Sequence, residues 1–288
     1  MKTFLDCIPC LIRQALHSVR STTEDEQVHE VIVRTALEGI AGMDFRQPPA
    51  VMAQAIHRRI REVTGNADPY VEQKRRLNDV ALELFPVFSQ RIEKAANPLE
   101  LAVRLAIAGN IMDLAVKTNL GEDEVLASFD DCLASPLDCH IDEFAQAVDE
   151  ADDILYLADN AGEIAFDRLL VEQLPRKKVT VAVRGKPVIN DATMADAEYV
   201  GLAKVAKIID NGSDAPGTIL SDCSDAFRRR FERADLIISK GQGNYETLAD
   251  CPRPIWFLLR VKCPIIARDL KCPVGTTILR RSLSRSAA

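Results

Sequence analysis

The 288-residue sequence has no long uninterrupted apolar run and no excess of basic residues. Without a run near 20 apolar residues, no membrane-spanning helix is expected. Asp6 and Arg13 interrupt the first apolar segment, MKTFLDCIPCLIRQAL, so it does not resemble a secretory signal. The formal net charge of -7 argues against a nucleic-acid binder, which would present a basic face. We therefore expect a cytoplasmic protein that acts on neither membranes nor nucleic acids.

The eight cysteines are spread along a long chain in which no export signal is recognised. They are Cys7, Cys10, Cys132, Cys139, Cys223, Cys251, Cys263 and Cys272. Reduced thiols are therefore expected rather than a disulfide framework. Cys7-x-x-Cys10 also suggests a structural zinc site, but such a site needs two further ligands, and the later cysteines form no second close pair. The sequence favours buried, unreactive thiols over zinc.

Two regions of different secondary structure are predicted. Helical spacing of apolar residues covers the segments 11–20, 26–40, 50–65, 71–88 and 97–116. From about Asp152, short apolar runs that end in polar turns alternate with helical segments, which is typical of a parallel sheet flanked by helices. The prediction is an α/β protein: a helical region (1–125) packed on a three-layer α/β/α Rossmann-like core (126–280) with a largely parallel sheet. The basic, Ser-rich residues 281–288 are expected to be a disordered tail.

Polar residues follow each predicted strand of the core. The four sets are Asp159-Asn160 with Gly162 and Glu163, Asn190-Asp191 with Asp196, residues 210–218 with Ser213 and Asp214, and Ser239-Lys240-Gly241. Because carboxyl ends of parallel strands meet at one edge of a sheet, these sets should converge there. Taken singly, each set could be an ordinary turn or helix cap, and Asp196 could be a surface residue.

Carboxylate and amide oxygens without a nearby histidine favour a hard divalent ion such as Mg2+ or Mn2+. The four histidines, His17, His29, His57 and His140, all lie elsewhere in the sequence. A lysine beside glycines supplies a positive charge and backbone N–H groups, which suit a phosphate. The loop that contains Ser213 and Asp214 could add hydroxyl and N–H donors. An ion beside a phosphate site indicates phosphoryl chemistry.

Several motifs resemble the metal-dependent damage-control phosphatase family, formerly a domain of unknown function. They are LADNAGEIAFDRLL, VRGKPVINDATMADAE, GSDAPGTIL, ADLIISKGQGNYETL, DCIPCLIRQAL and AIAGNIMDLAV, in family order over most of the chain. The C-terminal segment fits less well, because Lys271-Cys272 stands where the family has a more apolar pair. Some members of this family have been described, with dispute, as acidic-residue methyltransferases.

The resemblance implies a metal-dependent phosphatase that hydrolyses a small phosphorylated metabolite. It implies metal ligation by Asp159, Asn160 and Asp191, and phosphate binding by Lys240 with Gly241. It also places Asn110 and Asp113 of the helical region across the cleft, and makes Asp196 and Glu163 alternative candidates for activating the attacking water. Relatives often prefer Mn2+, Co2+ or Ni2+ to Mg2+, which oxygen-ligand chemistry alone does not predict.

Two other functions use parts of the same pattern. An S-adenosylmethionine-dependent methyltransferase would need a glycine-rich loop after the first core strand, and DNAGE supplies one glycine there. A non-catalytic binder of metals or phosphometabolites would use the same residues as the phosphatase, and turnover would distinguish the two. The sequence does not indicate an oligomeric state.

Overall fold

The computed structural model describes residues 1–109, 122–135, 137–175 and 178–282. In these residues seven strands form one sheet in the order β1-β7-β6-β5-β2-β3-β4. The strands are β1 (Leu137–Cys139), β2 (Ile154–Leu157), β3 (Val179–Val183), β4 (Lys207–Asp210), β5 (Leu236–Lys240), β6 (Trp256–Arg260) and β7 (Thr277–Arg281). Neighbours are parallel except β6 and β7, which are antiparallel. The predicted α/β class with a largely parallel sheet is confirmed.

Alternate residues along the strands are buried in two hydrophobic clusters, one on each face of the sheet. Ile154 and Tyr156 of β2 belong to one cluster, and Leu155 and Leu157 belong to the other. The first face is covered by α4 (Val71–Glu93), α5 (Pro98–Ala108), α7 (Glu122–Ala134), α8 (Ile141–Glu150), α9 (Glu163–Val171) and α10 (Met194–Tyr199). The second is covered by α11 (Asp225–Arg233), α12 (Gly241–Leu248) and α13 (Pro264–Leu270). These are the three layers that the sequence predicts.

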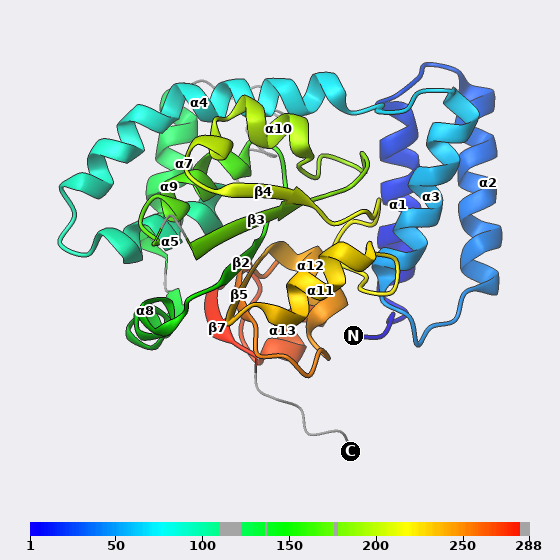
Figure 1. Cartoon of the computed structure of the whole chain (residues 1–288). Helices are drawn as coiled ribbons and strands as arrows, with labels where there is room; N and C mark the ends of the chain where they lie inside the picture. The colour runs from blue at the N-terminus through cyan, green and yellow to red at the C-terminus, as the bar shows by residue number, and fades with distance from the viewer. Residues whose placement is uncertain (110–121, 136, 176–177, 283–288) are drawn as a thin grey trace.

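The first three helices form a separate bundle beside the sheet (Figure 1). They are α1 (Cys7–Arg20), α2 (Glu26–Gly42) and α3 (Pro49–Thr64), and they share their own hydrophobic cluster. Their boundaries follow ordinary helix signals: Asp25 accepts a hydrogen bond from the backbone N–H of Gln27 before α2, and Gly65 adopts a left-handed conformation after α3. The helices predicted over the first hundred residues are therefore present.

The strand order reverses beside β2. From β2 the chain proceeds to β3 and β4 on one side, then crosses back to β5 on the other side of β2. Helix α9, after β2, packs on one face, whereas α12, after β5, packs on the opposite face. A crevice forms at the carboxyl ends of strands at such a reversal, and ligands of α/β proteins bind there. The loops after β2 and β5 are those that carry the Asp159 and Lys240 motifs.

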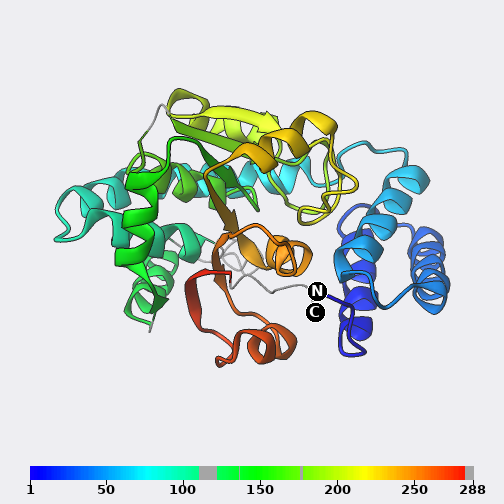
Figure 2. The same ribbon diagram turned by 60° about the horizontal axis from the view of Figure 1, so that its bottom comes forward.

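In the described part of the chain, no helix has both the length and the apolar character needed to cross a membrane. The predicted tail overlaps β7 at Arg281, and residues 283–288 lie outside the described residues. Figure 2 shows the bundle, the sheet and its flanking helices from a second direction.

Ion pairs join the bundle to the core through Asp214, which lies on the loop after β4. The guanidinium of Arg58 donates to Asp214 at 2.6 and 3.0 Å, Gln54 donates at 2.7 Å, and Arg61 forms a further ion pair. Arg61 also donates to the backbone oxygen of Pro187 at 2.7 Å. The Asp214 side chain is 5% exposed. Three side chains of α3 thus fasten the bundle to two core loops.

We predict that Asp214→Asn lowers the free energy of unfolding at pH 7 by about 2 kcal/mol, less than for a fully buried ion pair because the Arg58 side chain is half exposed. Burial raises the pKa of Asp214, but hydrogen bonds from Arg58 and Gln54 and the charges of Arg58 and Arg61 lower it to about 2. Because the folded pKa lies below the unfolded value, this stabilisation is complete above about pH 4 and disappears as the pH falls through 2.

Urea unfolding of both proteins between pH 7 and pH 2 measures this prediction. The difference between wild type and Asp214→Asn should shrink as the pH falls below 4. A difference that stays constant with pH, or is absent at pH 7, contradicts the assignment of Asp214 as the charged link between α3 and the core.

Candidate functional site

Two loops at the carboxyl edge of the sheet are joined through their main chains. The backbone of residues 159–161, after β2, pairs with that of residues 190–192, after β3, through two hydrogen bonds of 2.8 Å and an antiparallel bridge. The bridge sets Asn160 opposite Asp191. This pairing brings together the three residues for which the resemblance implies metal ligation, Asp159, Asn160 and Asp191.

The side chain of Asn160 connects Asp159 to Glu163. Its amide nitrogen donates to Asp159 Oδ2 at 3.1 Å and to Glu163 Oε2 at 3.0 Å. Gly241 closes the other side of Asp159: its φ is +78°, and a Cβ at this position would lie 1.8 Å from Asp159 Oδ2. Only glycine allows the start of α12 to approach the carboxylate so closely. The predicted residue Gly241 therefore lies in the site and shapes it.

Arg184, at the end of β3, is a site residue that sequence analysis did not identify. Its guanidinium donates to Asp191 at 2.6 Å through Nε and to Asp159 at 3.3 Å through Nη2, and Nη1 lies 3.3 Å from Asn244 Oδ1. The Arg184 side chain is 2% exposed. Its position at the carboxyl end of a strand, between Val183 and Gly185, is the one sequence signal that could have identified it.

Lys240 is fully buried beside the same site. Its ammonium donates to Glu163 and Asp167 at 2.6 Å each, and to the backbone oxygen of Ala106 at 2.7 Å. An ammonium has three N–H donors, and all three are used. Lys240 thus pairs with two carboxylates in this structure, and its predicted contact with a phosphate stays a prediction. Asp167 was missed by sequence analysis, although it lies one helical turn after Glu163 on the same face of α9.

The pKa values of the buried acids reflect this crowding. Burial, followed by the charges of Asp191 and Glu163, raises the pKa of Asp159 well above its usual range. Burial also raises the pKa of Asp191, and Arg184 opposes this shift. Burial raises the pKa of Asp167 to about 6, although Lys240 lowers it. For Lys240, burial lowers the pKa, but the charges of Asp167 and Glu163 outweigh burial and raise it.

Among the residues that the structure describes, four carboxylates and two cations make up this buried cluster. The carboxylates are Asp159, Glu163, Asp167 and Asp191, and the cations are Arg184 and Lys240. With all four acids ionised, the cluster would carry a formal excess of -2. Burying an uncompensated charge is costly, so the cluster is suited to take up a cation of charge +2.

The donor set limits how such an ion could be held. Among the described residues, no three His, Cys, Asp or Glu side chains form a group that could hold a metal. An ion at the carboxyl edge would therefore take the amide oxygen of Asn160 and water besides Asp159 and Asp191. Oxygen donors of this kind fit hard divalent ions.

Asp196 is engaged in holding α10 in place. Its Oδ2 accepts from the backbone N–H and the hydroxyl of Thr193 at 2.9 and 2.7 Å and forms an ion pair with Lys74 at 3.3 Å. Its Oδ1 accepts from Asn78 at 3.0 Å, and Asn78 also accepts from the backbone N–H of Gly162. Four donors thus surround the carboxylate of Asp196. Of the two predicted water-activating residues, Glu163 is the one that contacts Asn160.

The remaining predicted substrate-binding residues lie apart from this cluster or outside the described residues. The Ser213 hydroxyl donates to Asp222 at 2.6 Å and accepts from the backbone N–H of Ala215, which closes the loop after β4. Asp214 is held by the arginines of α3. The predictions for Asn110 and Asp113 fall outside the described residues.

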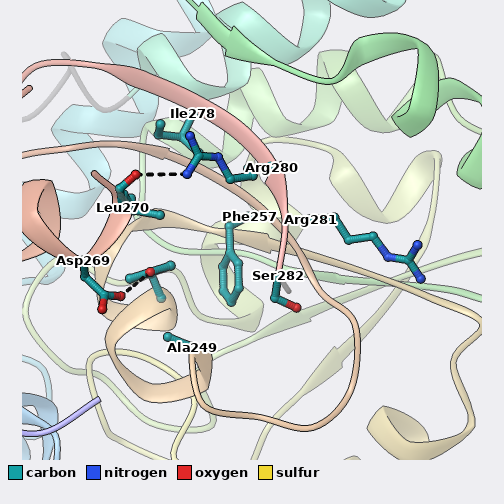
Figure 3. A pocket seen from close by; sticks show the side chains of 9 residues that line it. Ala249, Phe257, Asp269, Leu270, Ile278, Arg280, Arg281 and Ser282 are labelled. Atoms are coloured by element: carbon teal, nitrogen blue, oxygen red, sulfur yellow. Dashed lines mark hydrogen bonds between the residues drawn. The ribbon is translucent and has the colours of Figure 1, made fainter. Parts of the chain in front are cut away.

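A separate pocket lies between α12, α13 and the last two strands (Figure 3). Phe257 and Ile278 line it, Tyr245 donates to Asp269 at its edge, and Arg280 donates to the backbone oxygen of Leu270. It contains none of the residues that the sequence predicts to be functional.

We predict that Lys240→Met lowers the free energy of unfolding by about 3–5 kcal/mol, because it leaves Glu163 and Asp167 buried without their cation. Adding Asp167→Asn should restore part of that loss, since one of the two uncompensated charges is removed. Urea unfolding at pH 7 measures both variants, and Lys207→Met on the exposed side of β4 is the control. A loss below 1 kcal/mol for Lys240→Met would contradict the role of Lys240 as the shared cation.

Comparisons with known proteins identify the family of this chain. The model of the damage-control phosphatase ARMT1-like domain matches residues 3–278. A protein of Archaeoglobus fulgidus named damage-control phosphatase is 36% identical over 282 residues, covering 95% of this chain and 97% of the relative. An uncharacterized protein of Methanocaldococcus jannaschii is 34% identical, covering 95% of this chain and 93% of the relative.

A solved structure shows the same fold. The crystal structure of a DUF89 family protein from Pyrococcus horikoshii superimposes with a TM-score of 0.90 at 33% identity, covering 98% of this chain and 100% of the other. The fold, the length and the family model thus agree over nearly the whole sequence. This chain belongs to the damage-control phosphatase ARMT1-like family.

Proposed function

We propose that this protein is a metal-dependent phosphatase that hydrolyses small phosphomonoesters, such as sugar phosphates or damaged phosphometabolites. The observation that carries the proposal is the cluster of buried carboxylates at the strand-order reversal, where Asp159 and Asp191 lie together with the amide of Asn160. Membership of a damage-control phosphatase family supports the reaction class. In this proposal Asp159, Asn160 and Asp191 hold the ion, which is Mn2+, Ni2+, Co2+ or Mg2+.

A bound divalent ion would supply positive charge that polarises the phosphoryl group and acidifies a water molecule. The chain's own residues orient the reactants. Glu163 is the carboxylate best placed to accept the proton of the attacking water, since it contacts Asn160 directly. Lys240 keeps Glu163 in position through its 2.6 Å ion pair. Helix α12 begins at Gly241, so its positive end points to the same edge of the sheet and favours a phosphate there.

The assay uses protein stripped with chelator and an aryl phosphate substrate, with Mg2+, Mn2+, Co2+ or Ni2+ added back. Asp159→Asn and Asp191→Asn should abolish metal-dependent phosphate release. Asp210→Asn, which alters an exposed carboxylate at the end of the neighbouring strand β4, should keep it. Tight metal binding by the wild type without turnover on any phosphate ester would instead support the non-catalytic binder.

We predict that Gly241→Ala lowers phosphatase activity at least about 100-fold, because its Cβ displaces the carboxylate of Asp159 by more than an ångström. Gly275→Ala is the matched control. Gly275 also has a positive φ, +94°, but a Cβ there meets nothing within 4 Å.

The control should lose only about 1 kcal/mol of stability from backbone strain and keep its activity. Metal titration and turnover of the two variants measure the difference. Equal activity in the two variants would show that the close approach of Gly241 to Asp159 is unimportant for the site.

A further inference from the structure

A divalent ion at this edge of the sheet would compete with Arg184 for the carboxylate oxygens of Asp159 and Asp191. Its guanidinium spans Asp159 and Asp191, with Nε on Asp191 and Nη2 on Asp159. The side chain is 2% exposed, and its third group of donors, at Nη1, faces Asn244 and Thr218. A guanidinium keeps its charge at any ordinary pH, so a fixed positive charge already lies between the two aspartates.

Hydrogen bonds already occupy most of the carboxylate oxygens. Asp159 Oδ1 and Asp191 Oδ2 accept from Arg184, and Asp159 Oδ2 accepts from Asn160. Three of the four oxygens of the two aspartates are therefore engaged. Divalent ions that favour oxygen take about six ligands, so an ion here needs some of these oxygens. Each carboxylate oxygen could accept a hydrogen bond and ligate an ion at once, but an ion on these oxygens would lie within a few ångströms of the guanidinium charge and be repelled by it.

We propose that Arg184 is a displaceable counter-cation, which holds Asp159 and Asp191 together in the metal-free protein and releases at least one of them when the ion binds. The proposal rests on the metal site proposed above. It explains how two acidic side chains can remain buried side by side before the ion arrives. It also means that part of the attraction for the ion is used to displace Arg184, so the wild type binds metal more weakly than the bare carboxylates would.

Displacement also changes what Arg184 can do next. Because the backbone of Arg184 directly follows β3, the freed guanidinium would stay close to the ion. Its N–H donors form a planar fork that matches two oxygens of a phosphate. Arg184 then acts as a positioning residue that becomes available to an oxyanion once the ion is bound.

The sign of the change in metal affinity on removal of Arg184 distinguishes this proposal from its alternative. If Arg184 only orients the two carboxylates for the ion, its removal should weaken metal binding. If it competes with the ion, its removal should strengthen metal binding, because the two aspartates then face each other without a cation. Glutamine is the replacement of choice, since it keeps a polar side chain and removes the charge.

The experiment is calorimetric titration of chelator-stripped wild type, Arg184→Gln and Arg230→Gln with Mn2+ alone, without substrate. Arg230 is the control because its guanidinium also pairs with one aspartate, Asp153, but at the amino end of β2. We expect Arg184→Gln to bind Mn2+ about tenfold more tightly or better, equivalent to about 1.4 kcal/mol, and Arg230→Gln to match the wild type. Unchanged or weaker binding by Arg184→Gln overturns the proposal.

A second measurement covers the case in which Arg184→Gln does not fold without metal. NMR of the arginine Nε–H and Nη–H groups in the wild type follows the hydrogen bonds from Arg184 to Asp191 and to Asp159 directly. Addition of saturating Mg2+, which is diamagnetic, should shift at least one of these two signals strongly. If both signals stay in place at saturation, the proposal is overturned.

These outcomes separate the proposal from the proposed phosphatase function. Neither measurement needs turnover, so an inactive enzyme still gives an answer. If neither the wild type nor Arg184→Gln binds metal, the proposed metal site itself is wrong. If the wild type binds metal and Arg184→Gln binds it no better, only the role of Arg184 is wrong.

Discussion

Burial of several carboxylates at one edge of the sheet is the constraint on which the rest of the site depends. A buried carboxylate without a partner is costly, and each acid here shares a cation with a neighbour. Arg184 forms ion pairs with Asp159 and Asp191, and Lys240 forms ion pairs with Glu163 and Asp167. The same arrangement recurs nearby, where Lys74 pairs with both Asp68 and Asp196. The acids lie in the interior because these cations reach them from other elements.

The fold explains why the cluster forms at this place. The strand order reverses beside β2, so the loops after β2 and β5 leave the sheet toward opposite faces and open a crevice. Main-chain pairing of residues 159–161 with residues 190–192 then fixes two acidic loops in one register. Gly241 lets α12 start directly against Asp159. Backbone geometry thus sets the separation of the charged side chains, and the buried cations compensate the repulsion that results.

The sequence predicts the part of the site that depends on local pattern. Strands followed by Asp-Asn or Asn-Asp can be recognised in the amino-acid sequence, and a parallel sheet brings the carboxyl ends of these strands together. The partners of these residues depend on tertiary contacts and cannot be predicted in this way. Nothing in the local pattern around Arg58 and Arg61 indicates that α3 reaches Asp214, which was assigned to substrate binding. Likewise, the Lys-Gly pattern at Lys240 is typical of a phosphate site, but it contains no sign of the acids on α9.

We propose that one divalent ion is held at the carboxyl edge by Asp159, Asn160 and Asp191. Anomalous diffraction from crystals soaked in Mn2+ can locate this ion without reference to activity. We expect one strong peak bounded by oxygen atoms of these three side chains. A peak at another place, for example beside Cys7 and Cys10, with no signal at the carboxyl edge of β2, would contradict it.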